Sequence, residues 1–226
     1  MEGSQDRSKL IALGVFALIA VAVVAAILIG RGGDDDDSTA TTSSSGCKQV
    51  AAPKPKNVSY GAPKQTVTKG ETLVAVVETS CGAFEIALDA QRAPKTVNSF
   101  VFLSEKGFYD GLGFHRVAPG FVIQGGDPLG DGTGGPGYSV DEKPPANLAY
   151  TKGVVAMAKS SAEPPGRSGS QFYVVLAPDA GLPPEYALVG KVDEGLEVVE
   201  TIGKLGAPDE KPKQAVLIEK VSIEQG

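Results

Sequence analysis

The chain has 226 residues, with 27 Asp and Glu against 21 Lys and Arg, so its formal net charge is −6. This acidic balance argues against nucleic acid as a partner, because such binding depends on basic side chains that contact phosphate. One histidine and two cysteines are too few for a zinc finger, and no metal or cofactor is expected. The 29 glycines and an aromatic content of 6% favour a turn-rich β fold over a helical bundle.

Residues 10–30 form an apolar stretch, LIALGVFALIAVAVVAAILIG, without a charged or strongly polar residue. About 20 helical residues span the hydrocarbon core of a bilayer, so this stretch predicts a transmembrane helix. A cleaved signal peptide is the alternative, but its apolar region is shorter and ends at an A-x-A-like site. Arg7 and Lys9 precede the span, which by the positive-inside rule favours cytoplasmic residues 1–9 and an extracytoplasmic remainder.

Residues 31–70 combine four consecutive aspartates, a Ser/Thr tract and a Pro/Lys/Ala segment. Such a composition cannot bury enough apolar surface to order itself, so it predicts a disordered linker. Consecutive carboxylates lack the alternating spacing of a calcium loop, and we interpret them as a solvated charge run.

Cys47 in this linker and Cys81 in a predicted turn are the only thiols. In the expected orientation both lie on the oxidising side of the membrane, where a disulfide is stable. The alternative is two unrelated cysteines, since a sequence gives no distance between them.

Beyond residue 70 the pattern changes to short β-rich runs. Residues 72–78 and 83–88 flank a Thr-Ser-Cys-Gly turn and predict a hairpin. Pro94 then begins a helical pattern that Gly107 ends.

A second helix is predicted at 193–202 and a final strand at 215–223. Many short strands with two helices indicate a mainly β domain over 71–226, a closed antiparallel β-barrel capped by two α-helices.

Five blocks then occur in one order. They are FHRVAPGFVIQGGDPLGDGTGG at 114–135, GVVAMAK at 153–159, GSQFYV at 169–174, LPPEYALVGKV at 182–192, and the EGLEVVETI that follows. In these blocks the chain resembles the cyclophilin family of peptidyl-prolyl cis-trans isomerases, in a bacterial-like form with an N-terminal membrane anchor. The resemblance covers essentially everything from residue 72 to the end.

The resemblance implies that Arg116, Phe121 and Gln124 are catalytic. Rotation about an X-Pro amide is slow because the C–N bond has partial double-bond character. In the twisted state the prolyl nitrogen gains a lone pair, and a fixed donor such as the guanidinium of Arg116 lowers the barrier without covalent chemistry. Gln124 is expected to position Arg116 or the substrate backbone, and His115 to support Arg116 rather than transfer protons. For an isolated arginine, a surface ion pair is the alternative.

The resemblance also implies an apolar socket for the proline ring and a main-chain contact for the peptide around Ala158 and Lys159. Met157 and Phe172 are expected in the core. Gly181 stands where many eukaryotic members have tryptophan, and the segment between 159 and 170 is longer than in compact members, so the rim of the groove is expected to differ. The implied substrate-binding residues are Val122, Ala158, Lys159, Gln171, Tyr173, Leu182 and Tyr186.

The sequence therefore predicts an isomerase, anchored in the cell membrane by a single span, that acts on X-Pro bonds of exported proteins and assists their folding. Its partners would be proline-containing segments, with no cofactor, metal or nucleic acid. The alternative is a non-catalytic module of the same fold that binds proline peptides. A hydrolase is excluded because no G-x-S-x-G element is present.

Overall fold

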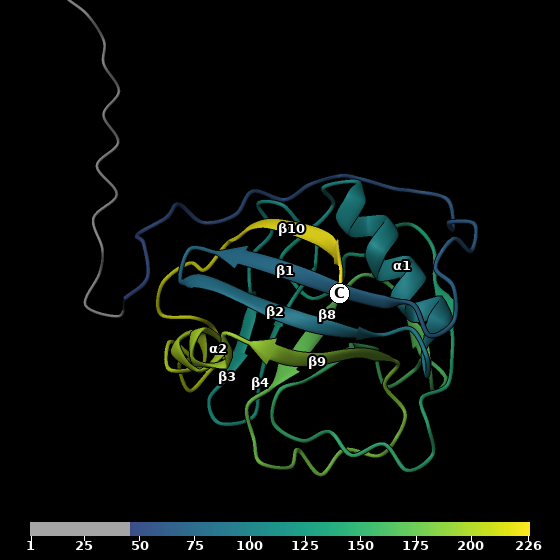
Figure 1. The fold of residues 1–226 in the computed structure, drawn as a ribbon. Helices are drawn as coiled ribbons and strands as arrows, with labels where there is room; N and C mark the ends of the chain where they lie inside the picture. Colours follow the sequence, from purple (N-terminus) through teal and green to yellow (C-terminus); the bar gives the residue numbers. More distant parts are fainter. Residues whose placement is uncertain (1–45) are drawn as a thin grey trace, which may run out of the picture. The chain divides into compact units, whose positions relative to one another are not determined.

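The computed structural model describes residues 46–226 (Figure 1). The predicted cytoplasmic tail (1–9), the transmembrane helix (10–30) and the first part of the linker lie outside the described residues. Within 46–226, none of the helices has the length and apolar character needed to cross a membrane.

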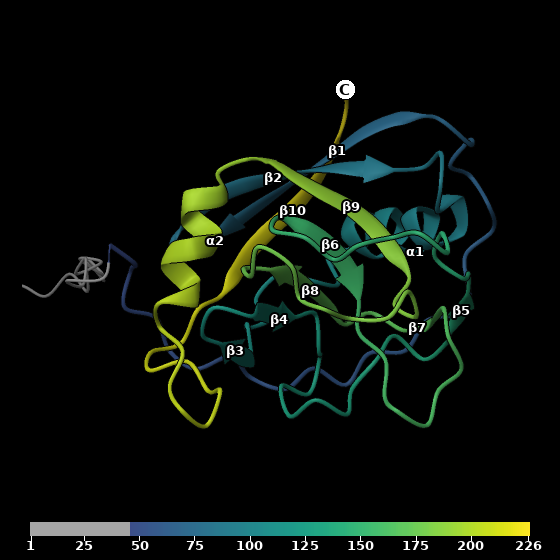
Figure 2. The ribbon, with the colours of Figure 1, turned by 90° about the horizontal axis from the view of Figure 1, so that it is seen from below.

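An eight-stranded sheet in which all neighbours are antiparallel forms the framework of the domain. A separate two-stranded ribbon pairs β5 (Val140–Asp141) with β7 (Arg167–Ser168). Figures 1 and 2 show that the large sheet is strongly curled. Its spatial order is β10 (Ile218–Gln225), β1 (Thr72–Thr79), β2 (Gly82–Asp89), β9 (Leu188–Glu194), β6 (Val154–Met157), β8 (Phe172–Val175), β4 (Val122–Gly125) and β3 (Arg116–Ala118).

The prediction of a closed barrel is wrong, because the edge strands β10 and β3 do not pair with each other. The segments that precede them are joined by an isolated bridge between Gly113 and Leu217 and by a few main-chain hydrogen bonds, such as Phe114 N to the carbonyl of Val216 at 3.0 Å. β3 has three residues, and the N–H of Val117 donates to the carbonyl of Glu210 at 2.7 Å. A loop therefore occupies the position that a closing strand would need.

Two helices, as predicted, cover the sheet at opposite ends (Figures 1 and 2). α1 (Pro94–Glu105) begins with proline and buries its apolar face against β2, β9 and β10. α2 (Leu196–Gly203) begins later than expected, because residues 193 and 194 belong to β9 and Gly195 turns the chain with φ 73°. The mainly β class with two helices is thus correct.

The core lies between the sheet and the helices. Its largest side chains are aromatic and at most 1% exposed. Several of them meet edge to face, as Phe100 and Phe172 do with ring centroids 5.7 Å apart. Met157 and Phe172 both lie in this core, as expected. A second buried cluster, which includes Tyr150, Tyr173 and Leu188, lies on the other face of the same strands and supports the candidate site.

Residues 46–70, which we call the N-terminal strap, are packed on the domain and differ here from the expected disordered linker. Lys48 N donates to the carbonyl of Ser80 at 2.7 Å, and Lys56 N donates to the carbonyl of Pro128 at 2.7 Å. The ring of Tyr60 packs on Phe102 with centroids 5.8 Å apart. A few apolar side chains and a few hydrogen bonds of the main chain thus hold a segment whose average composition is polar.

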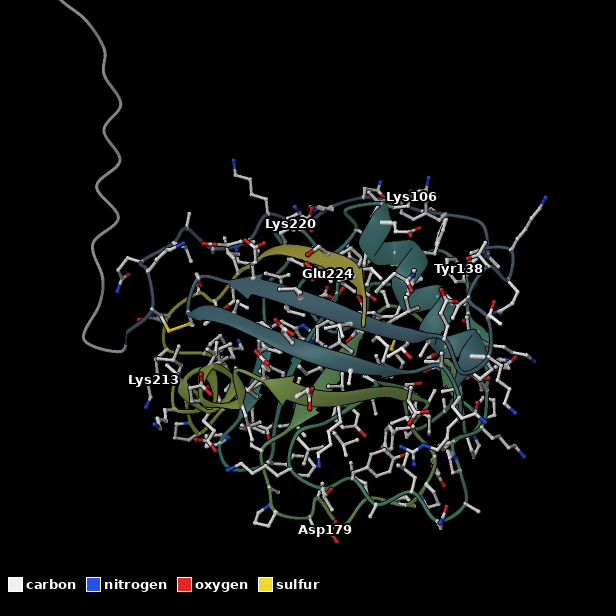
Figure 3. The ribbon with its side chains drawn as sticks, in the orientation of Figure 1. Lys106, Tyr138, Asp179, Lys213, Lys220 and Glu224 are labelled. Carbon is white, nitrogen blue, oxygen red and sulfur yellow. A yellow bond between two sulfur atoms is a disulfide. The ribbon has the colours of Figure 1, made fainter. Side chains whose placement is uncertain are left out.

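The strap is also covalently fixed, because Cys47 and Cys81 form a disulfide, drawn as a yellow bond in Figure 3. Cys47 has no exposed surface. The side-chain oxygen of Asn98 in α1 accepts from the N–H groups of Thr66 and Val67 at 2.7 and 3.0 Å. The strap is therefore held at both of its ends.

Candidate active site

Arg116 lies in β3 directly opposite Gln124 in β4. Its Nη1 donates to Oε1 of Gln124 at 3.3 Å, and its Nε donates to Oε2 of Glu210 at 2.6 Å. Gln124 Nε2 in turn donates to Oε1 of Gln171 at 3.0 Å, and Gln171 Nε2 donates to the carbonyls of two glycines in the 132–134 loop at 2.9 Å. The guanidinium is thus held between Glu210 on one side and the hydrogen-bonded pair of Gln124 and Gln171 on the other.

A pocket of about 210 Å³ lies beside this guanidinium. Its walls contain every predicted catalytic and substrate-binding residue except Gln171. Gln171 lines the adjoining pocket of about 690 Å³, which shares Gln124, Ala158 and Lys159 with the first. The lining residues of the smaller pocket are Arg116, Phe121, Val122, Gln124, Ala158, Lys159, Tyr173, Leu182 and Tyr186.

The smaller pocket has an apolar base and a cationic rim. Val122 and Tyr173 are 2% and 4% exposed, and the Cζ atom of Arg116 lies 5.9 Å from the ring centroid of Phe121. Pockets for drug-sized ligands have volumes of roughly 300 to 1,000 Å³. This pocket is smaller and suits one compact apolar ring with a donor at its edge.

Ala158 and Lys159 lie where the two pockets meet. The N–H of Ala158 already donates to the carbonyl of Gln171 at 2.8 Å, so a bound peptide cannot use this donor. The Lys159 ammonium is turned inward with its side chain 5% exposed, 3.3 Å from Glu185 and 5.4 Å from the ring centroid of Tyr186. Lys159 therefore lines the pocket with its aliphatic stem and its main chain, and not with its charge.

Tyr150, which the sequence did not single out, supports the pocket from below. Its hydroxyl donates to the carbonyl of Tyr186 at 2.7 Å and accepts from the N–H of Tyr186 at 2.9 Å. Burial raises the pKa of Tyr150 to about 12. Burial also raises the pKa of Tyr173 far above its usual value, and the Tyr173 hydroxyl has no hydrogen-bond partner among the described residues.

His115 precedes Arg116, and its Nδ1 atom is buried without a hydrogen-bond partner in the described part of the chain. Burial lowers the pKa of His115; the carboxylate of Asp127 opposes this effect and the charge of Arg116 adds to it. The supporting role of His115 that the sequence suggested stays a prediction.

Glu210 is the second residue near the site that sequence reasoning missed. It lies in the loop between α2 and β10, within APDEKPK, which has no apolar period and no recognised motif. Gly181, expected to alter the rim, is exposed and adopts φ 62°, a conformation in which any side chain would be strained. Within residues 46–226, no cluster of His, Cys, Asp or Glu could hold a metal ion.

The site thus belongs to a mainly β domain in which a curled antiparallel sheet holds an arginine at the rim of a small apolar pocket. The family model described as cyclophilin type peptidyl-prolyl cis-trans isomerase/CLD matches residues 74–223. The chain therefore belongs to the cyclophilin-type peptidyl-prolyl cis-trans isomerases and is an enzyme of that family.

Known relatives agree with this membership. Peptidyl-prolyl cis-trans isomerase B of Streptomyces anulatus is 39% identical over 174 residues, which covers 68% of this chain and 98% of the relative. Peptidyl-prolyl cis-trans isomerase-like 1 of Aspergillus fumigatus is 34% identical, with 67% and 96% covered. Bacterial and fungal relatives are thus similarly close, and the bacterial-like character stays a prediction.

Solved structures give the same result. A cyclophilin type peptidyl-prolyl cis-trans isomerase of Cryptosporidium parvum is 32% identical, with a TM-score of 0.63, and the match covers 69% of this chain and 99% of that one. A second structure of that protein, determined in the presence of the dipeptide Ala-Pro, has a TM-score of 0.62 at 32% identity, with 68% and 99% covered.

Proposed function

We propose that the small pocket binds the proline ring of an X-Pro segment and that Arg116 lowers the barrier to rotation of its amide. The observation that carries this proposal is the position of the Arg116 guanidinium, held by Gln124 at the rim of an apolar pocket of about 210 Å³. Phe121, Val122, Tyr173 and Leu182 supply the apolar surface that a pyrrolidine ring would contact.

The chemistry requires only a fixed donor. Rotation of a peptide bond has a barrier of roughly 18–20 kcal/mol, because the twisted amide loses its resonance. In that twisted state the prolyl nitrogen gains a lone pair, which an N–H of Arg116 can meet. Donors aimed at charge that develops only in the transition state lower the barrier without stabilising the ground state. No proton is transferred, so neither His115 nor a carboxylate is needed as an acid or base.

The test is an isomerisation assay on the detergent-solubilised full chain. Arg116→Ala should lower kcat/KM by about two to three orders of magnitude, as loss of one such donor does in other enzymes. Arg167→Ala is the matched control, because Arg167 is an exposed arginine paired with Asp141 on the two-stranded ribbon. Activity of Arg116→Ala within twofold of wild type would remove Arg116 from the mechanism.

We further propose that the enzyme acts outside the cytoplasm on exported proteins and assists their folding, anchored in the membrane by residues 10–30. The apolar span in the sequence supports the anchor, and the Cys47–Cys81 disulfide supports an oxidising compartment, because disulfides are rare in the cytosol.

Labelling of intact cells tests this location. A cysteine introduced at Lys106, which lies on the surface at the end of α1 (Figure 3), should react with a membrane-impermeant maleimide. A cysteine introduced near residue 5 should react only after permeabilisation. Protection of position 106 in intact cells would contradict the extracytoplasmic proposal and leave the isomerase proposal untouched.

A further inference from the structure

Glu210 contacts the arginine strand in two independent ways. Its carboxylate Oε2 accepts from Arg116 Nε at 2.6 Å, and its carbonyl accepts from the N–H of Val117 at 2.7 Å. β3 is an edge strand, so this loop residue satisfies a main-chain donor that would otherwise lack a partner.

The backbone of Glu210 is in a conformation that disfavours glutamate. With φ 61°, it is the one non-glycine residue with positive φ within residues 46–226. A glycine would adopt this conformation without strain, and strained non-glycine residues in proteins gather at functional sites. The loop does not need the side chain for its shape, because Glu210 N donates to the carbonyl of Ala207 and Ala207 N donates to the carbonyl of Lys211, both at 2.9 Å. The strain therefore points to a use for the carboxylate.

That use follows from the geometry of a guanidinium. Arg116 is 34% exposed and would otherwise sample many rotamers. Acceptors at both Nε and Nη1 fix the plane of the group, since these two nitrogens have fixed positions in a rigid fork. Among residues 46–226 no side chain or carbonyl accepts a hydrogen bond from Nη2, which leaves this nitrogen available to a substrate.

We propose that Glu210 is a positioning residue of the isomerase site, which holds the Arg116 guanidinium in the orientation that meets the prolyl nitrogen. The proposal rests on the isomerase function and adds a residue outside the sequence blocks that carry the family resemblance. Because Glu210 acts through Arg116 and does not itself line the pocket, its loss should affect turnover more than substrate binding.

Two substitutions in the full chain separate the side chain from the backbone. Glu210→Gly removes the carboxylate, keeps the carbonyl that binds Val117 and relieves the positive φ. It should lower kcat about tenfold with KM changed by less than about twofold, while Tm stays at or above the wild-type value. Glu210→Gln keeps an acceptor for Nε and should retain kcat within about threefold. Glu219→Gln is the control, because it makes the same charge change at a carboxylate that pairs with Lys48.

A second measurement is independent of activity. The Arg116 Nε–H signal in ¹⁵N NMR spectra should exchange slowly with water in the wild type and in Glu210→Gln, and rapidly in Glu210→Gly. An active wild type together with a Glu210→Gly variant of unchanged kcat would overturn the positioning role. Equal losses of kcat in the Gly and Gln variants would overturn it as well. An inactive wild type would instead contradict the isomerase proposal, so the two failures can be told apart.

Discussion

Two tyrosine hydroxyls beside the pocket are buried, but they differ in hydrogen bonding. Tyr150 makes two hydrogen bonds with the main chain of Tyr186, whereas the hydroxyl of Tyr173 has none among the described residues. A buried polar group without a partner costs about 1 to 3 kcal/mol, most of which is recovered when the group is removed.

We therefore predict opposite effects of the same substitution. Tyr173→Phe should raise the free energy of unfolding by about 1 kcal/mol, and Tyr150→Phe should lower it by about 1 to 2 kcal/mol. Urea denaturation of the two variants beside the wild type measures both changes. Changes of the same sign would show that the hydroxyl of Tyr173 has a partner after all.

His115 gives a prediction for pH. Burial lowers its pKa in the folded state below the unfolded value of 6.5, so the unfolded chain binds more protons in the window just below pH 6.5. The stability that comes from burying His115 in its neutral form is fully present above pH 6.5. It is lost as the pH falls toward the pKa of the folded state. In His115→Gln the slope of stability against pH in this window should be smaller than in the wild type, as thermal unfolding between pH 5 and 7 would measure. Identical slopes would contradict the account.

At the residue scale, sequence could predict the pocket because its walls come from short blocks with fixed internal order. Arg116 and Gln124 are eight positions apart in a hairpin, which places them opposite each other in register. Glu210 is 94 positions from Arg116 in a polar loop. A hydrogen bond across that separation depends on the fold of the loop, and no local pattern encodes it.

At the element scale, the strap behaves as part of the domain. Its average composition is polar, so a window-based argument predicts a linker. In the structure, however, Tyr60 and Val67 pack against the core, and Asn98 and Cys81 supply a hydrogen-bond acceptor and a disulfide partner. The prediction of a closed barrel was wrong for a related reason. Strand patterns give the number and the alternation of strands, whereas closure depends on whether the edge strands are long enough to pair.

The disulfide should contribute stability without being required for folding. It closes a loop with a sequence separation of 34, worth roughly 3 to 4 kcal/mol on the chain-entropy model, while the core lies almost entirely in the strands and helices after residue 71. Cys47→Ser should thus retain isomerase activity and lose up to about 3 kcal/mol of unfolding free energy. The wild type should lose the same amount when reduced. Unchanged stability on reduction would contradict this role, and a Cys47→Ser chain that fails to fold would show that the bridge is essential.

At the scale of the whole molecule, the domain supports one small site. Strands β3, β4 and β8 hold four of the pocket residues, the loops that flank the strands supply the others, and the loop of Glu210 contacts β3 through Arg116 and Val117. Most of the framework is far from the chemistry, which is common when a reaction needs one donor and one apolar surface in a fixed relation.

The measurement that tests the central claim most directly is exchange NMR on a short Ala-Pro peptide with the full chain in detergent. The account predicts that catalytic amounts of the chain accelerate cis-trans exchange of the peptide, that the rate is unchanged between pH 6.5 and 8.5 because no proton is transferred, and that Arg116→Ala abolishes most of the effect. Peptide binding to the pocket without faster exchange would contradict it and would identify a binding module on the same fold.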